Sequence, residues 1–138
     1  MIKRISLISA LFVTLSLITN CKNNQAETTS EIKLVTAEEM QTILDVEDAQ
    51  LIDVRTPEEF EEGHILNAQN IDFSSPTFDE EVNKLDKSRP VILYCRSGGR
   101  SAKCAEKMKE AGFKKIYDLE GGISKWQHSD KIRIEAKS

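Results

Sequence analysis

The strongest constraint on the fold is a short central unit, in which an apolar run leads through a glycine-containing turn into helix-forming residues. Val91–Tyr94 is a continuous apolar run, typical of a strand buried on both faces. Gly98 and Gly99 supply the turn, and the helical segment 100–111 ends before Gly112, in the position glycine prefers just past a helix. A buried strand that leads through a turn into a helix is the building unit of an α/β fold.

Two capping boxes mark helix starts earlier in the chain. Thr36 pairs with Glu39 and Thr56 with Glu59, so that hydroxyl and carboxylate satisfy each other's backbone donors. Pro57 stands at the first helical position, where its missing N–H is harmless. Helices are therefore predicted from residue 37, from residue 57, over 78–85 and, after a turn, within 121–126, and strands over 50–54, 68–71 and 115–118. The alternation predicts an α/β fold with a mainly parallel sheet flanked by helices.

Composition excludes several classes of protein. The chain has 138 residues, of which 39% are hydrophobic and 30% charged, which fits one globular domain. Three cysteines are too few for a disulfide-stapled scaffold. Two widely separated histidines leave little for a structural zinc site, and a net charge of −4 argues against a nucleic-acid partner. We expect no metal and no cofactor, and we assume a monomer.

The first residues have the pattern of an export signal. Lys3 and Arg4 precede an apolar run of 14 residues, 5–18, shorter than the ~18 that a membrane span requires. The run closes on Cys21 and resembles a bacterial lipoprotein signal, in which that cysteine is acylated and becomes the mature N-terminus. The alternative is ordinary secretion with an incidental cysteine.

These features divide the chain into three parts. Residues 1–20 are predicted to be a signal peptide, residues 21–31 a flexible tether poor in apolar side chains, and residues 32–138 the folded domain. Acylation of Cys21 would anchor the exported domain by lipid alone, in the bacterial cell envelope and facing the periplasm.

Cys95 opens the turn after the buried strand, at the end of the strand where open α/β sheets bind ligands. A glycine-rich turn directs backbone N–H groups inward, and the following helix N-terminus adds to this anion site. Lowering a thiol pKa from ~8.5 by two units takes about 2.7 kcal/mol. We expect the helix terminus, Arg96 and Arg100 to supply this free energy.

The charge around the turn is also positive. Five basic residues and one acidic residue between 91 and 109 would attract anions. The alternative is a buried structural cysteine beside a tight turn.

The pattern Cys95-x-x-Gly98-x-Arg100-Ser101 resembles the active-site loop of the rhodanese (thiosulfate sulfurtransferase) family. Residues 51–71 resemble the first signature block of that family, with Asn67 where glycine is usual, and residues 118–126 resemble its closing block. Together the blocks cover about residues 32–128.

The resemblance implies a rhodanese-like three-layer fold around a five-stranded, mainly parallel sheet. It also implies a persulfide on Cys95, formed from a small anionic donor such as thiosulfate and passed to a thiol or cyanide-type acceptor. By position, Arg100 would close the loop and stabilise negative charge, and Arg96 and Ser97 would line its mouth. The expected substrate-binding loop comprises Arg96, Ser97, Gly98, Gly99 and Ser101.

The other polar residues are interpreted as structural support. Asp53 and Arg55 are expected to form ion pairs near the loop, and Glu59 and His64 to serve structure rather than catalysis. Cys104 fits a small buried core residue better than a disulfide partner of Cys95.

Two other functions stay open. Related phosphatases carry a Cys-x5-Arg loop, whereas this chain has Cys-x4-Arg, a tighter ring that suits sulfur better than phosphate. A rhodanese-like module that only binds a partner or senses redox state is the second alternative, although such inactive members typically lack the cysteine.

Overall fold

The computed structural model describes residues 29–136. The predicted signal peptide and Cys21 lie outside the described residues. Among the described residues, no helix combines the length and apolarity needed to cross a bilayer.

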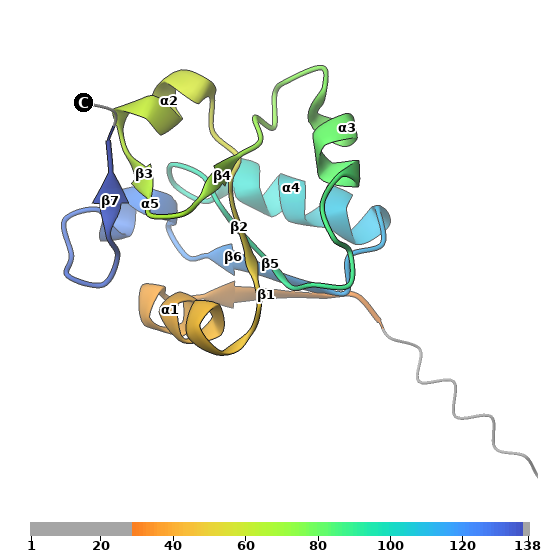
Figure 1. Cartoon of the computed structure of the whole chain (residues 1–138), viewed down its shortest axis with the longest axis horizontal. Helices are drawn as coiled ribbons and strands as arrows, with labels where there is room; N and C mark the ends of the chain where they lie inside the picture. The colour runs from red at the N-terminus through yellow and green to blue at the C-terminus, as the bar shows by residue number, and fades with distance from the viewer. Residues whose placement is uncertain (1–28, 137–138) are drawn as a thin grey trace, which may run out of the picture.

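Five parallel strands form the central sheet, in the order β1-β6-β5-β2-β4, as Figure 1 shows. Their bounds are Glu31–Val35 (β1), Gln50–Asp53 (β2), Gln69–Asn70 (β4), Val91–Tyr94 (β5) and Lys115–Leu119 (β6). β5 is the middle strand and is fully buried. The predicted five-stranded parallel sheet is confirmed.

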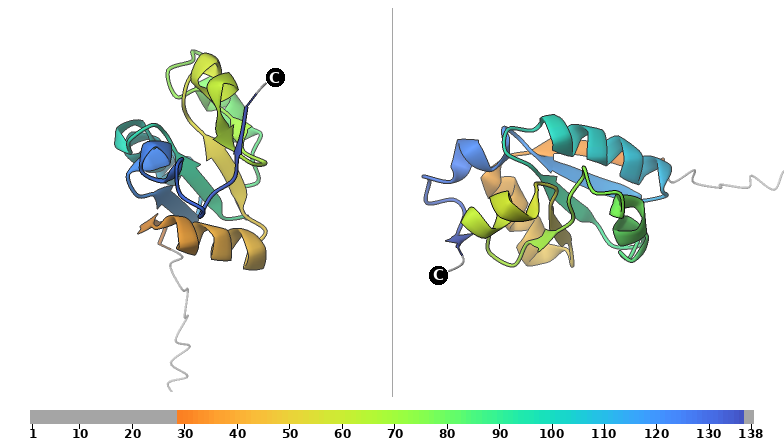
Figure 2. Two further views of the ribbon diagram at one scale, coloured as in Figure 1. Left: turned by 90° about the vertical axis from the view of Figure 1, so that its left-hand side faces the viewer. Right: turned by 90° about the horizontal axis from the view of Figure 1, so that it is seen from above.

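Helices cover both faces of the sheet and give three layers (Figure 2). One face carries α3 (Phe78–Asn83) and α4 (Gly99–Glu110), whose apolar residues join one core cluster. The other face carries α1 (Ala37–Val46) and α5 (Gly122–Trp126), which contribute to a second cluster. Strand β5 serves both clusters, because side chains that alternate along a strand point to opposite faces.

The helix starts follow the sequence signals. Both capping boxes are present, with Thr36 and Thr56 as N-caps, and α2 (Pro57–Glu62) begins at its proline. Helix α3 is shorter than the predicted 78–85. The backbone of Asn67 has φ +65°, a left-handed conformation that asparagine tolerates, which explains why an asparagine can stand where glycine is usual.

Three strands were not predicted from the sequence. β1 begins at Glu31, one residue before the expected start of the domain, and pairs along the edge of the sheet with β6. β3 (His64–Ile65) and β7 (Ile134–Glu135) form a separate antiparallel pair. Each of these two strands has only two residues, too few for an alternating pattern to appear.

Candidate active site

Cys95 lies between the end of β5 and the start of α4, with 1% of its surface exposed. The backbone N–H of Gly98 donates to its Sγ at 3.1 Å. The Ser101 hydroxyl lies 3.5 Å from the same sulfur. The sulfur is thus held inside the turn by donors from both the loop and the first turn of α4.

These contacts favour the thiolate. Burial raises the pKa of Cys95, but hydrogen bonds from the Ser101 hydroxyl and from the backbone N–H groups of Ser101, Gly98 and Ser97 outweigh it, so that the pKa lies below its ordinary value. Because a thiolate and not a thiol is the nucleophile, the loop prepares Cys95 for attack.

The loop keeps its shape through glycines at two places. Gly98 has φ +105°, a left-handed conformation that favours glycine, whereas Gly99 has an ordinary φ and open space around it. Gly122, at the start of α5, packs so closely that a Cβ there would lie 2.5 Å from the Arg96 carbonyl oxygen. The neighbouring Ile123 N–H donates to the Cys95 carbonyl at 3.0 Å and fixes the start of the loop.

The two loop arginines bind a carboxylate rather than the sulfur. Arg100 donates to both Glu59 oxygens, at 2.6 and 2.9 Å, and Arg96 Nε donates to Glu59 at 3.1 Å. Hydrogen bonding by Arg100 is the main reason that the pKa of Glu59 falls to about 2. The hydrogen bonds that lower the Cys95 pKa come from backbone amides and the Ser101 hydroxyl, while Arg100, held by Glu59, interacts with the Cys95 thiolate through charge.

Asp53 and Arg55 form the predicted structural ion pair. Arg55 Nη2 lies 2.6 Å from Asp53 Oδ2, and both residues are buried. The same guanidinium donates to the Gly63 carbonyl at 2.7 Å, and Asn70 donates to the Asp53 and Arg55 carbonyls. This network connects the end of β2 to the segment that follows α2.

Comparison with known proteins agrees with this geometry. The profile of the Rhodanese-like domain matches residues 36–129. The chain belongs to this family. The relative named Thiosulfate sulfurtransferase GlpE, from Coxiella burnetii, is 39% identical over 80 residues, which cover 58% of this chain and 73% of that protein. Uncharacterized protein YqhL of Bacillus subtilis is 46% identical over 78 residues, 56% of this chain, but the match spans only 60% of its length.

A solved structure shares the rhodanese-like fold. The crystal structure of a rhodanese-like domain protein from Staphylococcus aureus superposes with a TM-score of 0.65 at 32% identity, covering 77% of this chain and 99% of that one. The fold expected from the resemblance is thereby confirmed.

Glu59 is the site residue whose role sequence reasoning missed. Its capping-box position predicts one partner, the Thr56 N–H, and that bond is present at 3.0 Å. Its contacts with Arg96 and Arg100 join α2 to the rhodanese-like loop, 37 and 41 residues further along the chain. No local pattern signals such a contact.

Cys104 lies deep in the core, as expected. It is 0% exposed and unbridged, and burial is the main cause that raises its pKa to about 12. Among residues 29–136, no cluster of three or more histidine, cysteine or acidic side chains could hold a metal ion.

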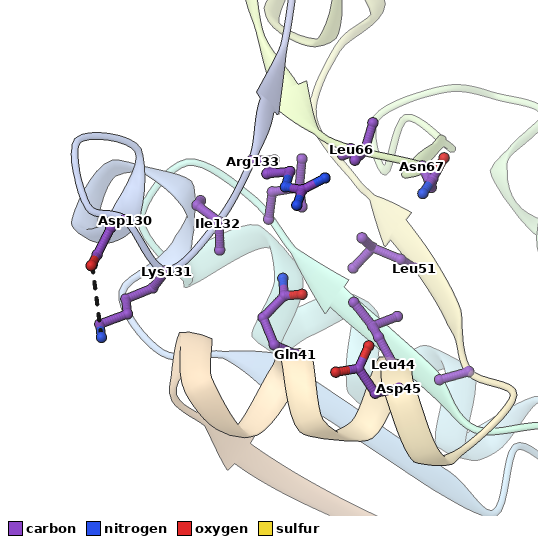
Figure 3. A pocket seen from close by; sticks show the side chains of 12 residues that line it. Gln41, Leu44, Asp45, Leu51, Leu66, Asn67, Asp130, Lys131, Ile132 and Arg133 are labelled. Atoms are coloured by element: carbon purple, nitrogen blue, oxygen red, sulfur yellow. Dashed lines mark ion pairs between the residues drawn. The ribbon is translucent and has the colours of Figure 1, made fainter.

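Two cavities differ in whether a residue of the Cys95 loop lines them. One of about 380 Å³ is lined by Arg96 and Glu59 together with Ser124, Gln127 and His128. Another, of about 670 Å³, lies between α1 and the segment 130–133 and includes no residue of the Cys95 loop (Figure 3). Of these two cavities, only the smaller is lined by a residue of the Cys95 loop, Arg96.

Proposed function

We propose that this rhodanese-like protein is a sulfurtransferase that carries a sulfane sulfur on Cys95. The observation that carries the proposal is the set of donors around one sulfur: the Gly98 N–H at 3.1 Å, the Ser101 hydroxyl at 3.5 Å, and a Cys95 pKa below its ordinary value. Relatives named as thiosulfate sulfurtransferases support it.

In the first step the Cys95 thiolate attacks the outer sulfur of a donor such as thiosulfate. A new S–S bond forms to Cys95, and the bond to the central sulfur breaks, so that sulfite leaves with the bonding electron pair. The persulfide retains one negative charge, and the donors that hold the thiolate can hold this product as well. The lowered pKa of Cys95 favours the ionised nucleophile, so this step assigns no general base.

In the second step an acceptor attacks the terminal sulfur of the persulfide. With cyanide the product is thiocyanate, and the Cys95 thiolate leaves and is regenerated. The cavity of about 380 Å³ beside Arg96 and Glu59 offers a path by which the acceptor can approach the loop. The two half-reactions predict ping-pong kinetics.

Intact mass spectrometry after thiosulfate treatment tests the persulfide. One added sulfur is expected on the wild-type chain and on Cys104→Ser, and none on Cys95→Ser. Sulfur retained by the Cys95 variant would contradict the proposal.

The same preparation separates the two alternatives. Turnover of an aryl phosphate in preference to thiosulfate would identify a phosphatase, which the Cys-x4-Arg spacing does not favour. A folded chain that turns over neither substrate would identify a binding or redox-sensing module.

We also propose, from the sequence of residues 1–21, that the domain is exported and anchored through an acylated Cys21. The mass of the mature protein should then include acyl chains on Cys21, and Cys21→Ser should leave the membrane fraction. An unmodified mature chain recovered from the soluble fraction would contradict this.

A further inference from the structure

Glu59 binds both arginines of the Cys95 loop, although it lies in α2. Its two oxygens accept hydrogen bonds from Arg100 Nη1 and Nη2 at 2.6 and 2.9 Å and from Arg96 Nε at 3.1 Å. The Thr56 N–H donates to the same carboxylate at 3.0 Å and holds it at the start of the helix. Only 15% of the Glu59 side chain is exposed, so its charge is poorly screened by solvent. The carboxylate is therefore a fixed negative charge at the mouth of the loop.

The charges around the reactive sulfur balance one another. Glu59 is ionised near neutral pH, since its pKa is about 2, and the lowered pKa of Cys95 favours the thiolate. These two negative charges face the two positive charges of Arg96 and Arg100. A dianion therefore gains little attraction here over a monoanion, whereas it loses more hydration when it approaches a cysteine that is 1% exposed.

The cavity of about 380 Å³ beside the loop has a similar balance. Two arginines, two glutamates and one histidine are among the residues that line it. Arg55 is paired with Asp53 at 2.6 Å and Arg96 with Glu59 at 3.1 Å, while Glu62 adds another carboxylate. Both arginines along this route to the loop thus already have a carboxylate partner.

The basic segment 91–109 attracts anions less than its composition suggests. Three of its five basic side chains form ion pairs: Arg96 and Arg100 with Glu59, and Lys107 with Asp79 at 3.2 Å. The paired carboxylates offset part of the positive charge on which the predicted attraction depends.

We propose that Glu59 is a specificity-determining residue for the sulfur donor: by offsetting one positive charge of the loop, it makes the site discriminate against dianionic donors in favour of sulfane-sulfur donors with one negative charge or none. Thiosulfonates and the persulfides of small thiols are donors of this class. The Cys95 thiolate attacks their outer sulfur, a new S–S bond forms, and a sulfinate or a thiolate leaves with the electron pair of the broken bond. This role rests on the proposed function, in which Cys95 carries the sulfur.

Thiosulfate and methanethiosulfonate are the probes, because a methyl group in the second replaces one charged oxygen of the first. The measured quantity is kcat/KM for each donor with cyanide as acceptor, which reports the donor step in a ping-pong reaction. Glu59→Gln keeps a capping-box residue at this position and removes the charge. It should raise the ratio of kcat/KM for thiosulfate to kcat/KM for methanethiosulfonate about tenfold.

Two further variants and a matched control sharpen the test. Arg96→Gln should lower the same ratio by about threefold, a smaller effect because its side chain is 61% exposed. Combined with Glu59→Gln, it should bring the ratio back to within about threefold of the wild type. Glu58→Gln removes an exposed carboxylate from the same helix and should leave the ratio unchanged. Thermal unfolding checks each fold, and Arg96→Gln alone decides the test if the Glu59 variants do not fold.

Three results would overturn the inference: a ratio that stays constant in Glu59→Gln because both donors slow equally, a ratio that does not fall in Arg96→Gln, or a rise in Glu58→Gln as large as in Glu59→Gln. The first would leave Glu59 a purely structural role, and the last would indicate an effect of the net charge of the chain. If both donors yield thiocyanate and the ratios do not move, the proposed function stands and this role does not. Thiocyanate from neither donor would overturn both.

Discussion

Cys95 and Cys104 are nine residues apart and are both buried, yet they have opposite properties. Around Cys95, loop amides and the Ser101 hydroxyl overcome burial and lower the pKa. Around Cys104, burial prevails and raises the pKa to about 12. The comparison teaches that burial alone does not decide whether a thiol is reactive; hydrogen-bond donors directed at the sulfur do.

The largest expected effect is a difference in the rate of thiocyanate formation between the Cys95 and Cys104 variants. Cys95→Ser should reduce thiocyanate formation from thiosulfate and cyanide to the background rate, because it removes the atom on which we propose that sulfur is carried. Cys104→Ser should retain the rate within about twofold, since a core thiol is replaced by a group of similar size. Circular dichroism checks that both variants fold. A Cys104 variant as inactive as the Cys95 variant would contradict the contrast.

The next effect concerns chemical reactivity. At pH 7 the thiolate fraction of Cys104 is about 10⁻⁵ for a pKa of about 12, whereas the lowered pKa of Cys95 gives it a much larger thiolate fraction. Iodoacetamide followed by peptide mass spectrometry should therefore modify Cys95 first. Both residues should react at similar rates in denaturant, and equal labelling in the folded state would refute the difference.

A backbone change should bring Cys95 closer to an ordinary thiol. Gly122→Ala places a methyl group within 2.6 Å of the Cys95 and Arg96 carbonyl groups, at a φ of +60°. We expect about 2 kcal/mol or more of lost stability and a tenfold or greater fall in the rate of sulfur transfer.

Gly99→Ala is the matched control, because nothing lies within 4 Å of a Cβ at that position. It should keep the stability within about 0.5 kcal/mol of the wild type. If both substitutions lowered stability equally, the close contact of Gly122 with the loop would not be the cause of the loss.

The smallest effect concerns the carboxylate that binds the loop arginines. Glu59→Gln should lower stability at neutral pH by about 1–2 kcal/mol through weakened bonds to Arg100 and Arg96. Since the folded pKa of Glu59 is about 2, below its ordinary 4.5, its contribution is present above pH 4.5 and is lost as the pH falls toward 2.

Thermal unfolding from pH 7 to pH 2 measures this contribution. The stability difference between wild type and variant should shrink over the acid range. A difference that stays constant with pH would show that the ion pairs do not cause it.

Local signals carried much of the prediction. Three features depend only on neighbouring residues: the apolar run of β5, the capping boxes at Thr36 and Thr56, and the Cys95 loop pattern. The sequence therefore predicted the two helix starts, the burial of β5 on both faces and the candidate nucleophile. The two-residue strands β3 and β7 could not, because pairing between segments 70 residues apart leaves no local periodicity.

The sequence by itself determined that a cysteine would begin a glycine turn between a buried strand and a helix, and that basic residues would surround it. Only the tertiary structure decided which groups act on the sulfur. It placed Arg96 and Arg100 against Glu59 and brought Gly122 against the loop. The reason is physical: hydrogen bonds and charges act over a few ångströms in space, and the partners come from segments far apart in the chain.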